Sequence, residues 1–382
     1  MRVLHLMSEF RWTGLAEPVV NLVQATQRQG VEVYFACRAV PARRALSRSA
    51  TVADMARRRG VEPLLCFCLN RHRPFPGAVM DLWALRRFIR RRGIDIVQTH
   101  RSHDHLIGGL AARIARCGRV VRMNHTAMPL RPSWGNRFML SGLTDGYIGF
   151  SHGATEADTR EFKIPSDRAV AVEPAVDLER FDGDRPRADI RGSLGLTDRH
   201  VLVGVVARMQ PHRRFDVLFE AVRLAHDRVP QLRVVLLGGG TDIQAVAREP
   251  LVAAGLDQIV HVVGRRRDDY ADYLAGLDFK IFLMPGSDGT CRAVREAMAM
   301  GKPVIAARRG MLAELVSHER AGLVVEDTPQ NLAKAIIRLA LDEPLRRNLG
   351  ATAKAHARQH FRMDRQADAV LAFYERLRST AS

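Results

Sequence analysis

A chain of 382 residues with 47% hydrophobic and 26% charged residues has a globular composition, which excludes wholesale disorder and suits two domains. No apolar run approaches the roughly 20 residues that a membrane-spanning helix needs, and the first residues begin a strand rather than a signal peptide. The net charge of +18 is concentrated in residues 1–150, where 24 Lys and Arg face 9 Asp and Glu, so we expect this half to attract phosphates, an anionic membrane surface or nucleic acid.

In the first half of the chain, short β-like runs alternate with amphipathic helical patterns. Apolar residues recur every three or four positions at 18–29 and 82–92, which predicts helices. Runs that are apolar throughout are typical of parallel strands covered by helices on both faces. Short β-like runs predict strands at 3–6, 31–36, 63–67, 96–99, 120–123 and 146–150, and most of the predicted strands of the chain are apolar throughout.

The chain also holds five cysteines, an odd number for its length. Cys66 and Cys68 form a C-x-C pair inside an apolar run, without a second pair of ligands. This pattern favours buried thiols over a zinc site and indicates a reducing cytoplasm.

The second half repeats the alternation of strands and helices, with strands predicted at 201–206, 234–237, 259–263, 279–283, 303–306 and 322–325. Pro, Gly and acidic residues interrupt the pattern at 172–190, so we place a domain boundary there. The repeated alternation predicts two doubly wound α/β domains. Ligands of such sheets bind beyond the carboxyl ends of the strands, so the loops that follow strands are the candidate site.

One such loop lies in "SDGTCRAVREAMAMGKPVIA" at residues 287–306, where Asp288 and Glu296 flank the mouth of a helix. Amides at a helix start bind anions, and a carboxylate can accept two sugar hydroxyls. With Gly289 and Thr290 after the first acid, the pattern resembles the E-x7-E signature of the retaining family 4 glycosyltransferases. The resemblance implies that Asp288, where the family has Glu, contacts the donor sugar and Glu296 the nucleotide ribose. The plain structural alternative is that Asp288 is a helix N-cap and Glu296 an exposed helical residue.

A basic loop about 80 residues upstream follows a strand in "VGVVARMQPHRRFDVLFEAV". It resembles the family's G-R-x4-K-G segment, with Arg208 at the arginine and Arg213 at the lysine. Ala207 and Arg214 stand at the two glycines. The resemblance implies that Arg208 and Arg213 grip the donor diphosphate and neutralise the leaving phosphate. A slide of one residue would exchange the roles of Arg213 and Arg214, and a solvated basic loop is the structural alternative.

Histidines follow two strands of the first half. His125 in "VVRMNHTAM" resembles the family's strand-end histidine, which lies near the reacting sugar. His100, His103 and His105 in "QTHRSHDH" follow the preceding strand, and His100 matches another strand-end histidine of the family. The H-x-x-H-x-H spacing is not a recognised ligand pattern, so we expect no metal there.

Other segments resemble the family more loosely. The first loop, "SEFRWTGLAEP", is similar to the family's GGAE opening at Gly14, with Leu15 in place of the second glycine. "LLGGG" places Gly239 in the turn after the second strand of the C-terminal domain. The resemblance implies that Gly264 and Arg265 lie under the nucleotide base.

The sequence lacks the motifs of several other enzyme classes. The sequence has no G-x-G-x-x-G with its following acid, no phosphate-binding P-loop and no loop D-x-D of a metal-dependent transferase. A sugar-nucleotide epimerase of the same architecture stays an alternative. So does a pseudoenzyme that holds a sugar nucleotide, because Leu15, Asp288 and Cys291 depart from the family pattern. Nucleic-acid binding would rest on net charge alone, without a motif or interleaved aromatic residues, so we do not expect it.

Taken together, the residues and the resemblance predict an α/β protein of GT-B architecture, with two Rossmann-like domains facing across a cleft. Residues 1–175 would bind the acceptor, 176–362 the nucleotide sugar, and a helix at 363–382 would cross back onto the first domain. The implied activity is a retaining, metal-independent hexosyl transfer without a cofactor, from a nucleotide-diphosphate sugar to an envelope glycolipid or lipopolysaccharide intermediate. The basic stretch at 82–93 would dock on an anionic membrane from the cytoplasm, or its apolar residues are simply the core face of a helix.

Overall fold

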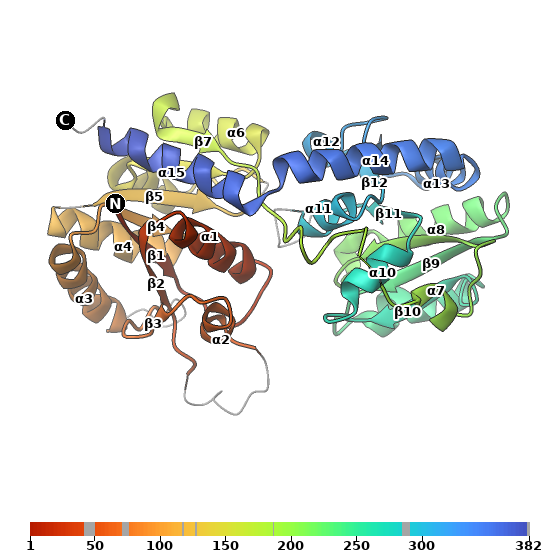
Figure 1. The fold of residues 1–382 in the computed structure, drawn as a ribbon, viewed down its shortest axis with the longest axis horizontal. Coiled ribbons are helices and arrows are strands. Elements are labelled where there is room, and N and C mark those ends of the chain that lie inside the picture. The colour runs from red at the N-terminus through yellow and green to blue at the C-terminus, as the bar shows by residue number, and fades with distance from the viewer. Residues whose placement is uncertain are drawn as a thin grey trace. The chain divides into compact units, whose positions relative to one another are not determined.

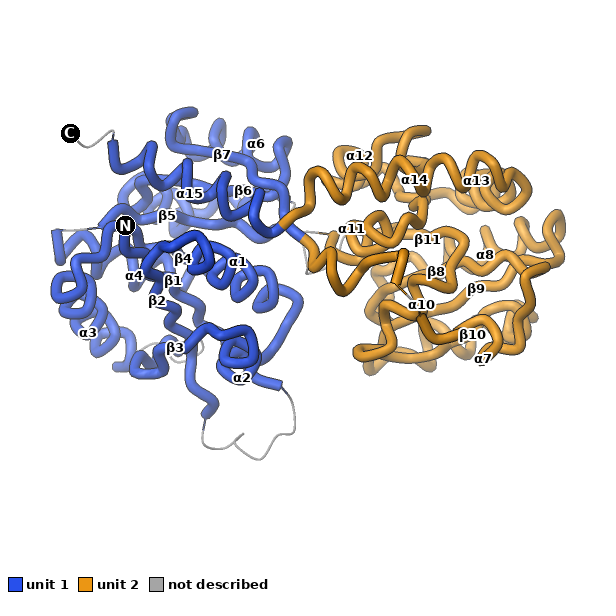
Figure 2. Tube along the Cα trace, viewed as in Figure 1, with its two compact units in different colours: residues 1–175, 287–290, 363–382 blue, residues 176–286, 291–362 orange. Residues whose placement is uncertain are grey.

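The computed structural model describes residues 1–41, 50–70, 76–116, 118–126, 128–185, 187–284 and 291–379. Within them the chain forms two parallel sheets, one of seven strands and one of six (Figure 1). Two compact units result (Figure 2). Unit 1 contains Met1–Ala175 and Met363–Ser382, and unit 2 contains Val176–Gly286 and Cys291–Arg362. The predicted α/β class with two doubly wound sheets is confirmed.

The sheet of unit 1 has the order β3-β2-β1-β4-β5-β6-β7. Its strands are β1 (Arg2–Met7), β2 (Glu32–Cys37), β3 (Pro63–Leu64), β4 (Ile96–Thr99), β5 (Arg119–Asn124), β6 (Gly146–Gly149) and β7 (Ala169–Ala171). The helices are α1 (Ala16–Arg28), α2 (Val52–Arg57), α3 (Gly77–Arg92), α4 (Ser102–Ala115), α5 (Trp134–Phe138), the π-helical η2 (Met139–Leu143), α6 (His152–Phe162), η3 (Ser166–Arg168) and α15 (Met363–Ser379). The strand order reverses between β1 and β4, which makes their carboxyl ends the topological switch point.

Helices cover both faces of this sheet because successive strand residues point to opposite sides. Leu4 and Leu6 pack with Leu85 of α3 in one core cluster. On the other face of the sheet, Val3 packs with buried residues that include Leu22 of α1 and Phe373 of α15. α1 and α15 also contact one another, so the end of the chain completes the core of unit 1.

The sheet of unit 2 has the order β10-β9-β8-β11-β12-β13. Its strands are β8 (Val201–Val206), β9 (Leu232–Leu237), β10 (Val260–Gly264), β11 (Phe279–Phe282), β12 (Val304–Ala307) and β13 (Gly322–Val325). The helices are α7 (Ile190–Ser193), η4 (Pro211–Arg213), α8 (Phe215–His226), η5 (Gln244–Arg248), α9 (Glu249–Ala253), α10 (Tyr270–Gly276), α11 (Arg292–Ala299), α12 (Leu312–Leu315), α13 (Pro329–Leu341) and α14 (Glu343–His360). Here the switch point lies between β8 and β11.

The observed strands follow the predicted ones to within two residues at each end, with two exceptions. β7 was not predicted, because its three residues are half-buried and form no long apolar run. β3 ends at Leu64 instead of continuing to 67. Beyond β3, Phe67 enters the core while Cys66 and Cys68 are exposed, so the expectation of buried thiols there is wrong.

The basic stretch of α3 has a clear core face. Leu85 and Ile89 are fully buried, and Leu82 and Phe88 are half-buried against the same cluster. The apolar stripe within 82–92 is therefore committed to the interior of unit 1. None of the helices in the described ranges is long and apolar enough to cross a membrane.

Candidate functional site

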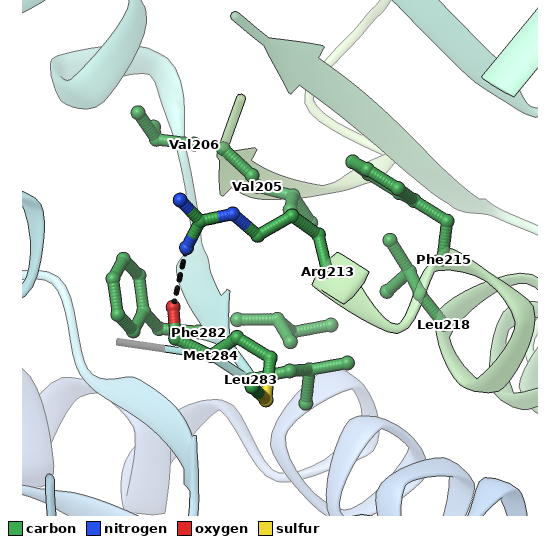
Figure 3. Close-up of a pocket in the computed structure, with 10 residues that line it drawn as sticks. Val205, Val206, Arg213, Phe215, Leu218, Phe282, Leu283 and Met284 are labelled. Atoms are coloured by element: carbon green, nitrogen blue, oxygen red, sulfur yellow. Dashed lines mark hydrogen bonds between the residues drawn. The ribbon is translucent and has the colours of Figure 1, made fainter. Parts of the chain in front are cut away.

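A small hollow of about 20 Å³ lies at the switch point of unit 2, where the ends of β8 and β11 meet (Figure 3). Residues 205–207 and 281–284 line it, together with the start of α8. Arg213 is the charged side chain in its wall, and the guanidinium Nη1 donates a hydrogen bond to the Met284 carbonyl at 3.3 Å. The place where the topology favours a ligand in this unit is thus lined by a positively charged side chain.

Two neighbouring arginines serve different partners. Arg213 is 9% exposed, and burial together with the charge of Arg208 lowers its pKa. Its guanidinium stays protonated at neutral pH, since an arginine side chain is effectively always charged in proteins. Arg214 has a φ of 60° and pairs with Asp327 at 2.8 Å, and Asp327 also holds Arg309 at 2.6 Å. Arg213, not Arg214, therefore lines the hollow.

Glycine residues hold the neighbouring loops close to one another. The Gly238 amide donates to the Gly264 carbonyl at 2.8 Å, and the Met209 amide donates to the Gly239 carbonyl at 3.3 Å. A Cβ at Gly238 would lie 1.8 Å from the Ala207 carbonyl oxygen, so only glycine fits this turn. The loops after β8, β9 and β10 consequently form one backbone layer at the carboxyl edge.

Positive charge gathers on this layer. The exposed Arg208 follows β8, and the exposed Arg265 follows Gly264 at the end of β10. A Cβ built on Gly239 would contact Arg265 Cβ at 3.6 Å. Burial and the charges of Arg267 and Arg208 lower the pKa of Arg265. Groups whose charges repel one another in this way are suited to bind an anion.

Glu296 is buried in α11, with 4% of its surface exposed, so the exposed-residue interpretation is wrong. Arg292 Nε lies 3.3 Å from the Glu296 carboxylate. Burial raises the pKa of the neighbouring Tyr270, and the charge of Glu296 raises it further. Lys280 of β11 lies beneath the first turn of the helix, where Nζ donates to the Ala293 carbonyl at 2.7 Å. Burial lowers the pKa of Lys280 to about 7, while the charge of Glu296 opposes the shift.

The first acid of the pattern precedes α11 in the sequence. Asp288, Gly289 and Thr290 lie outside the described residues. Cys291, the residue before the helix, is buried and has a φ of 49°. The family's second glycine stands at this position in the resemblance, which fits the left-handed backbone conformation.

Three histidines form a chain at the carboxyl edge of the unit 1 sheet. His5 Nδ1 lies 3.1 Å from His100 Nε2, and His100 Nδ1 lies 2.8 Å from His125 Nε2. All three are buried, and burial lowers the pKa of His5 and of His125 to about 3 and that of His100 well below its usual value. The chain crosses β1, β4 and β5 as neutral imidazoles at neutral pH.

The other two histidines of "QTHRSHDH" lead elsewhere. His105 Nε2 is hydrogen-bonded to Thr144 Oγ1 at 2.8 Å. His103 is half-buried, and burial lowers its pKa, with opposing effects from the charges of Asp81 and Arg38. His100, His103 and His105 therefore do not converge on one point.

Ion pairs and hydrogen bonds tie the first loop to α4 at the switch point of unit 1. Glu9 pairs with Arg101 at 3.1 Å, and the Ser8 amide donates to Asp104 at 2.8 Å. Burial raises the pKa of Asp104 to about 6. Farther along the loop, Gly14 is half-buried in the turn before α1, and the adjacent Leu15 packs against the core. The side chain that replaces the family's glycine thus has a place in the interior of unit 1.

Several residues of these sites were not predicted from the sequence. His5 and Lys280 both stand inside apolar runs, "VLHLM" and "DFKIF", where a buried strand has no ordinary use for a polar side chain. That isolated polarity was the available signal. The contact of Tyr270 with Glu296 left no comparable trace in the sequence, because it joins two helices.

Comparison with known proteins gives the family. Residues 12–180 match the family described as Glycosyltransferase Family 4, and residues 200–342 match that described as Glycosyl transferases group 1. The chain belongs to the family 4 glycosyltransferases. Between them these two matches take in both units of the glycosyltransferase fold described above.

Relatives and solved structures extend the comparison. The D-inositol 3-phosphate glycosyltransferase of Jonesia denitrificans is 34% identical over 223 residues, covering 55% of this chain and 52% of the relative. The chain thus spans about half of that relative's length. The GDP-mannose-dependent alpha-(1-6)-phosphatidylinositol monomannoside mannosyltransferase of Mycobacterium tuberculosis is 26% identical over 307 residues, covering 76% and 77%. The crystal structure of Anabaena Alr3699/HepE in complex with UDP shares the fold, with a TM-score of 0.80 at 18% identity, covering 97% and 100%.

Proposed function

We propose that this glycosyltransferase moves a hexose from a nucleotide-diphosphate donor to an acceptor with retention at the anomeric carbon, without a metal ion or another cofactor. The observation that carries the proposal is the group of Arg208, Arg213 and Arg265 at the carboxyl edge of unit 2. Arginine binds phosphate oxygens with paired N–H groups and keeps its charge in a partly buried site. The guanidinium groups of Arg208 and Arg213 can therefore take the role that a divalent cation has in metal-dependent transferases, while Arg265 adds positive charge beside them.

The family resemblance supplies the remaining roles in the donor site. Glu296 would bind the ribose, Gly264 and Arg265 would lie under the base, and Gly239 would form the neighbouring turn of the donor site. Gly289 and Thr290 would complete the phosphate contacts, with Asp288 on the sugar. On the side of unit 1, Gly14 would approach the donor and His125 would face the reacting sugar.

The reaction that these groups support is a front-face displacement. The bond between the anomeric carbon and the phosphate oxygen breaks, and the departing phosphate oxygen takes the proton of the attacking acceptor hydroxyl. The new glycosidic bond forms on the same face of the sugar. Arg208 and Arg213 stabilise the negative charge on the diphosphate, and His125 supports the positive charge on the sugar.

A calorimetric titration panel tests the donor site. UDP, GDP, ADP and their common hexose conjugates are titrated into the full chain, and one nucleotide is expected to bind. Glu296→Ala is expected to weaken that binding about 10- to 100-fold, because a hydrogen bond to a carboxylate contributes about 1.5–3 kcal/mol. Glu249→Ala, an exposed carboxylate of the same unit, is the matched control and should leave the affinity unchanged.

The outcomes of the panel separate the alternatives. No binding by any nucleotide would contradict the donor site. Binding without transfer to any acceptor would identify a sugar-nucleotide-binding pseudoenzyme, and interconversion of the free sugar nucleotide would identify an epimerase.

For the acceptor we propose an envelope glycolipid or lipopolysaccharide intermediate, reached at the inner face of the cytoplasmic membrane. The support is a docking face on unit 1, formed by the exposed side chains of α3, α4, residues 128–133 and α5. These elements adjoin one another, since α4 contacts both α3 and η2, which continues α5. All large apolar side chains of unit 1 that are exposed, within its described ranges, lie on this face: Val79, Met80, Trp83, Ile114, Met128, Trp134 and Phe138.

The same face is strongly basic. The elements of this face, residues 77–92, 102–115, 128–133 and 134–138, contain eight arginines and two acidic residues, and both acidic residues, Asp81 and Asp104, are buried. Within the described part of the chain, Arg87, Arg90 and Arg91 of α3 form no ion pair. Exposed tryptophans beside unpaired arginines are suited to the interface of an anionic bilayer, whereas nucleic-acid binding would call for a recognised motif, which the sequence lacks.

Vesicle co-sedimentation tests the docking face. The full chain is expected to pellet with vesicles that contain anionic lipid and to stay in solution with neutral ones. Arg87→Glu, Arg90→Glu and Arg91→Glu combined should weaken this binding more than about 100-fold, because each arginine near the surface contributes about 1 kcal/mol. Trp83→Ser with Trp134→Ser should weaken it further without changing the net charge.

Arg228→Glu and Val252→Ser, which alter exposed residues of unit 2, serve as matched controls and should not affect vesicle binding. Equal binding to neutral and anionic vesicles would contradict the proposal. So would binding to a soluble anionic polymer in preference to vesicles.

A further inference from the structure

A cavity in unit 1, which we call the amino-edge pocket, lies away from the groups assigned to the transfer reaction. It measures about 450 Å³ and is enclosed by η2, the carboxyl end of α6 and the residues that follow α6. Thr144 and Asp145 line it just before β6, and Arg168 lines it just before β7. The parallel strands begin at this edge of the sheet, whereas His100 and His125 follow strands at the opposite, carboxyl edge. The pocket is therefore not part of the site proposed for the sugar.

We propose that the amino-edge pocket binds the phosphate group of a membrane phospholipid headgroup. The charges of the pocket select the phosphate, because arginine and lysine side chains bind phosphate oxygens through charge-assisted hydrogen bonds. The docking face described above identifies the source of that phosphate as a lipid. The inference rests on the proposed function only for this source, since phosphate binding is argued from the pocket itself.

Two cations in the wall of the amino-edge pocket are uncommitted. Within the described parts of the chain, the side chains of Lys163 and Arg168 form no ion pair and no hydrogen bond. Both are exposed, so they can turn toward a ligand. Asp167, the exposed acid beside Arg168, does not line the pocket. α6 ends just before Lys163, but a helix end carries only about half a negative charge, so the two cations keep an excess of positive charge.

The two acids that line the pocket are already neutralised. Glu161 of α6 forms an ion pair with Arg137 of α5. Asp145 is buried and lies between two arginines, Arg113 at 3.0 Å and Arg119 at 3.5 Å. Because each carboxylate has its own cation, neither is left to repel an anion. The net charge that a ligand meets in the pocket is therefore positive.

The size and lining of the pocket suit a headgroup better than a free phosphate ion. The volume falls within the range of small-molecule sites, about 300–1000 Å³, and a phosphate ion would fill only a small part of it. Leu140 and Phe162 form a buried apolar part of the wall, and Ile164 packs with them. The exposed Ser141 adds a hydroxyl group. A phosphate joined to a larger polar body, with an apolar portion nearby, matches this lining.

The pocket adjoins the docking face through α5 and η2. Arg137 lines the pocket and stands on α5 between Trp134 and Phe138, whose rings stack with centroids 5.9 Å apart. Ser141 follows Phe138 by three positions, so the two lie on neighbouring parts of one helical surface. Trp134 is 82% exposed, as an aromatic side chain at a bilayer interface would be. A lipid whose chains contact these rings can place its phosphate in the pocket.

Vesicle co-sedimentation of the full chain with two anionic lipids tests the proposal. One set of phosphatidylcholine vesicles contains phosphatidylglycerol, and the other contains oleate, an anionic lipid without phosphate, at the same surface charge. The unaltered protein is expected to bind the phosphatidylglycerol vesicles about tenfold more tightly, because a hydrogen bond to a charged group is worth at least that factor. Lys163→Gln with Arg168→Gln should abolish this preference.

Arg87→Gln with Arg90→Gln is the matched control, because it removes two exposed charges from the docking face and none from the pocket. It should weaken binding to both kinds of vesicle and keep the preference for phosphatidylglycerol. Equal binding of the unaltered protein to both kinds of vesicle would overturn the proposal. So would an equal loss of the preference in the two double variants.

A soluble ligand separates the pocket from the docking face. Glycerol 1-phosphate carries the phosphate of a headgroup without the lipid chains, and its binding to the full chain is followed by amide nuclear magnetic resonance. We expect shifts at Ser141 and Lys163, which Lys163→Gln with Arg168→Gln should remove. If these shifts appear but no vesicle is bound, the docking face and the lipid source are wrong and the phosphate site stands. If vesicles bind without preference and no shift appears, the docking face stands and the phosphate site is wrong.

Discussion

Arg213→Ala is expected to lower kcat for sugar transfer by about 100- to 1000-fold, the usual effect of removing one preorganised group that stabilises transition-state charge. Arg213 is the buried cation at the switch point of unit 2, held by the Met284 carbonyl at 3.3 Å. Negative charge on the leaving diphosphate grows as the glycosidic bond breaks, so the loss should appear mainly in kcat. Steady-state kinetics with the nucleotide sugar identified by calorimetry measures it.

Arg214→Gly is the matched control for this prediction. It removes the same charge from the same loop, but its side chain serves Asp327, and glycine accepts the φ of 60° without strain. We expect kcat within a few-fold of the unaltered enzyme. Arg213→Lys keeps a positive charge in the hollow and should retain most of the activity that Arg213→Ala loses. Equal losses in Arg213→Ala and Arg214→Gly would show that neither arginine has a specific role in the reaction.

Gly238→Ala is expected to destabilise the protein by about 3–5 kcal/mol, through a clash and backbone strain together. Its Cβ would lie 1.8 Å from the Ala207 carbonyl oxygen, a backbone atom that cannot turn away, and its φ is +146°. The Ala207 amide is itself bound to the Leu237 carbonyl at 3.0 Å, so relief of the clash would disturb the start of the arginine loop. For a unit of this size the midpoint of thermal unfolding should fall by roughly 10 °C.

Urea and thermal unfolding of the full chain, followed by circular dichroism, check this expectation. Gly255→Ala is the control, because its φ of +65° is also positive but a Cβ there meets no atom within 4 Å. It should cost only the backbone strain, about 1–2 kcal/mol. A Gly238→Ala protein as stable as Gly255→Ala would mean that the loops after β8 and β9 are less closely packed than the structure indicates.

The sequence by itself determined the secondary structure of most of the sheet and the loops that carry chemistry. Apolar runs of strand length, such as 201–206 and 322–325, matched strands residue for residue, because a parallel strand buried on both faces tolerates few polar residues. Arg213 and Glu296 were singled out by the resemblance to the family 4 glycosyltransferases, in the segments that follow such runs. The position and burial of a strand are local properties, so the local pattern of apolar residues predicts them.

Only the tertiary structure decided which of these residues meet. His5 and His100 are separated by 95 positions and touch because β4 lies beside β1, a strand order that periodicity does not encode. The tertiary structure also decided that Arg213 and not Arg214 lines the hollow. Arg214 has a left-handed backbone conformation, and its side chain binds Asp327, which is 113 positions away. Sequence patterns record whether a side chain is buried, whereas the partner that a buried polar group finds depends on the order in which the strands assemble.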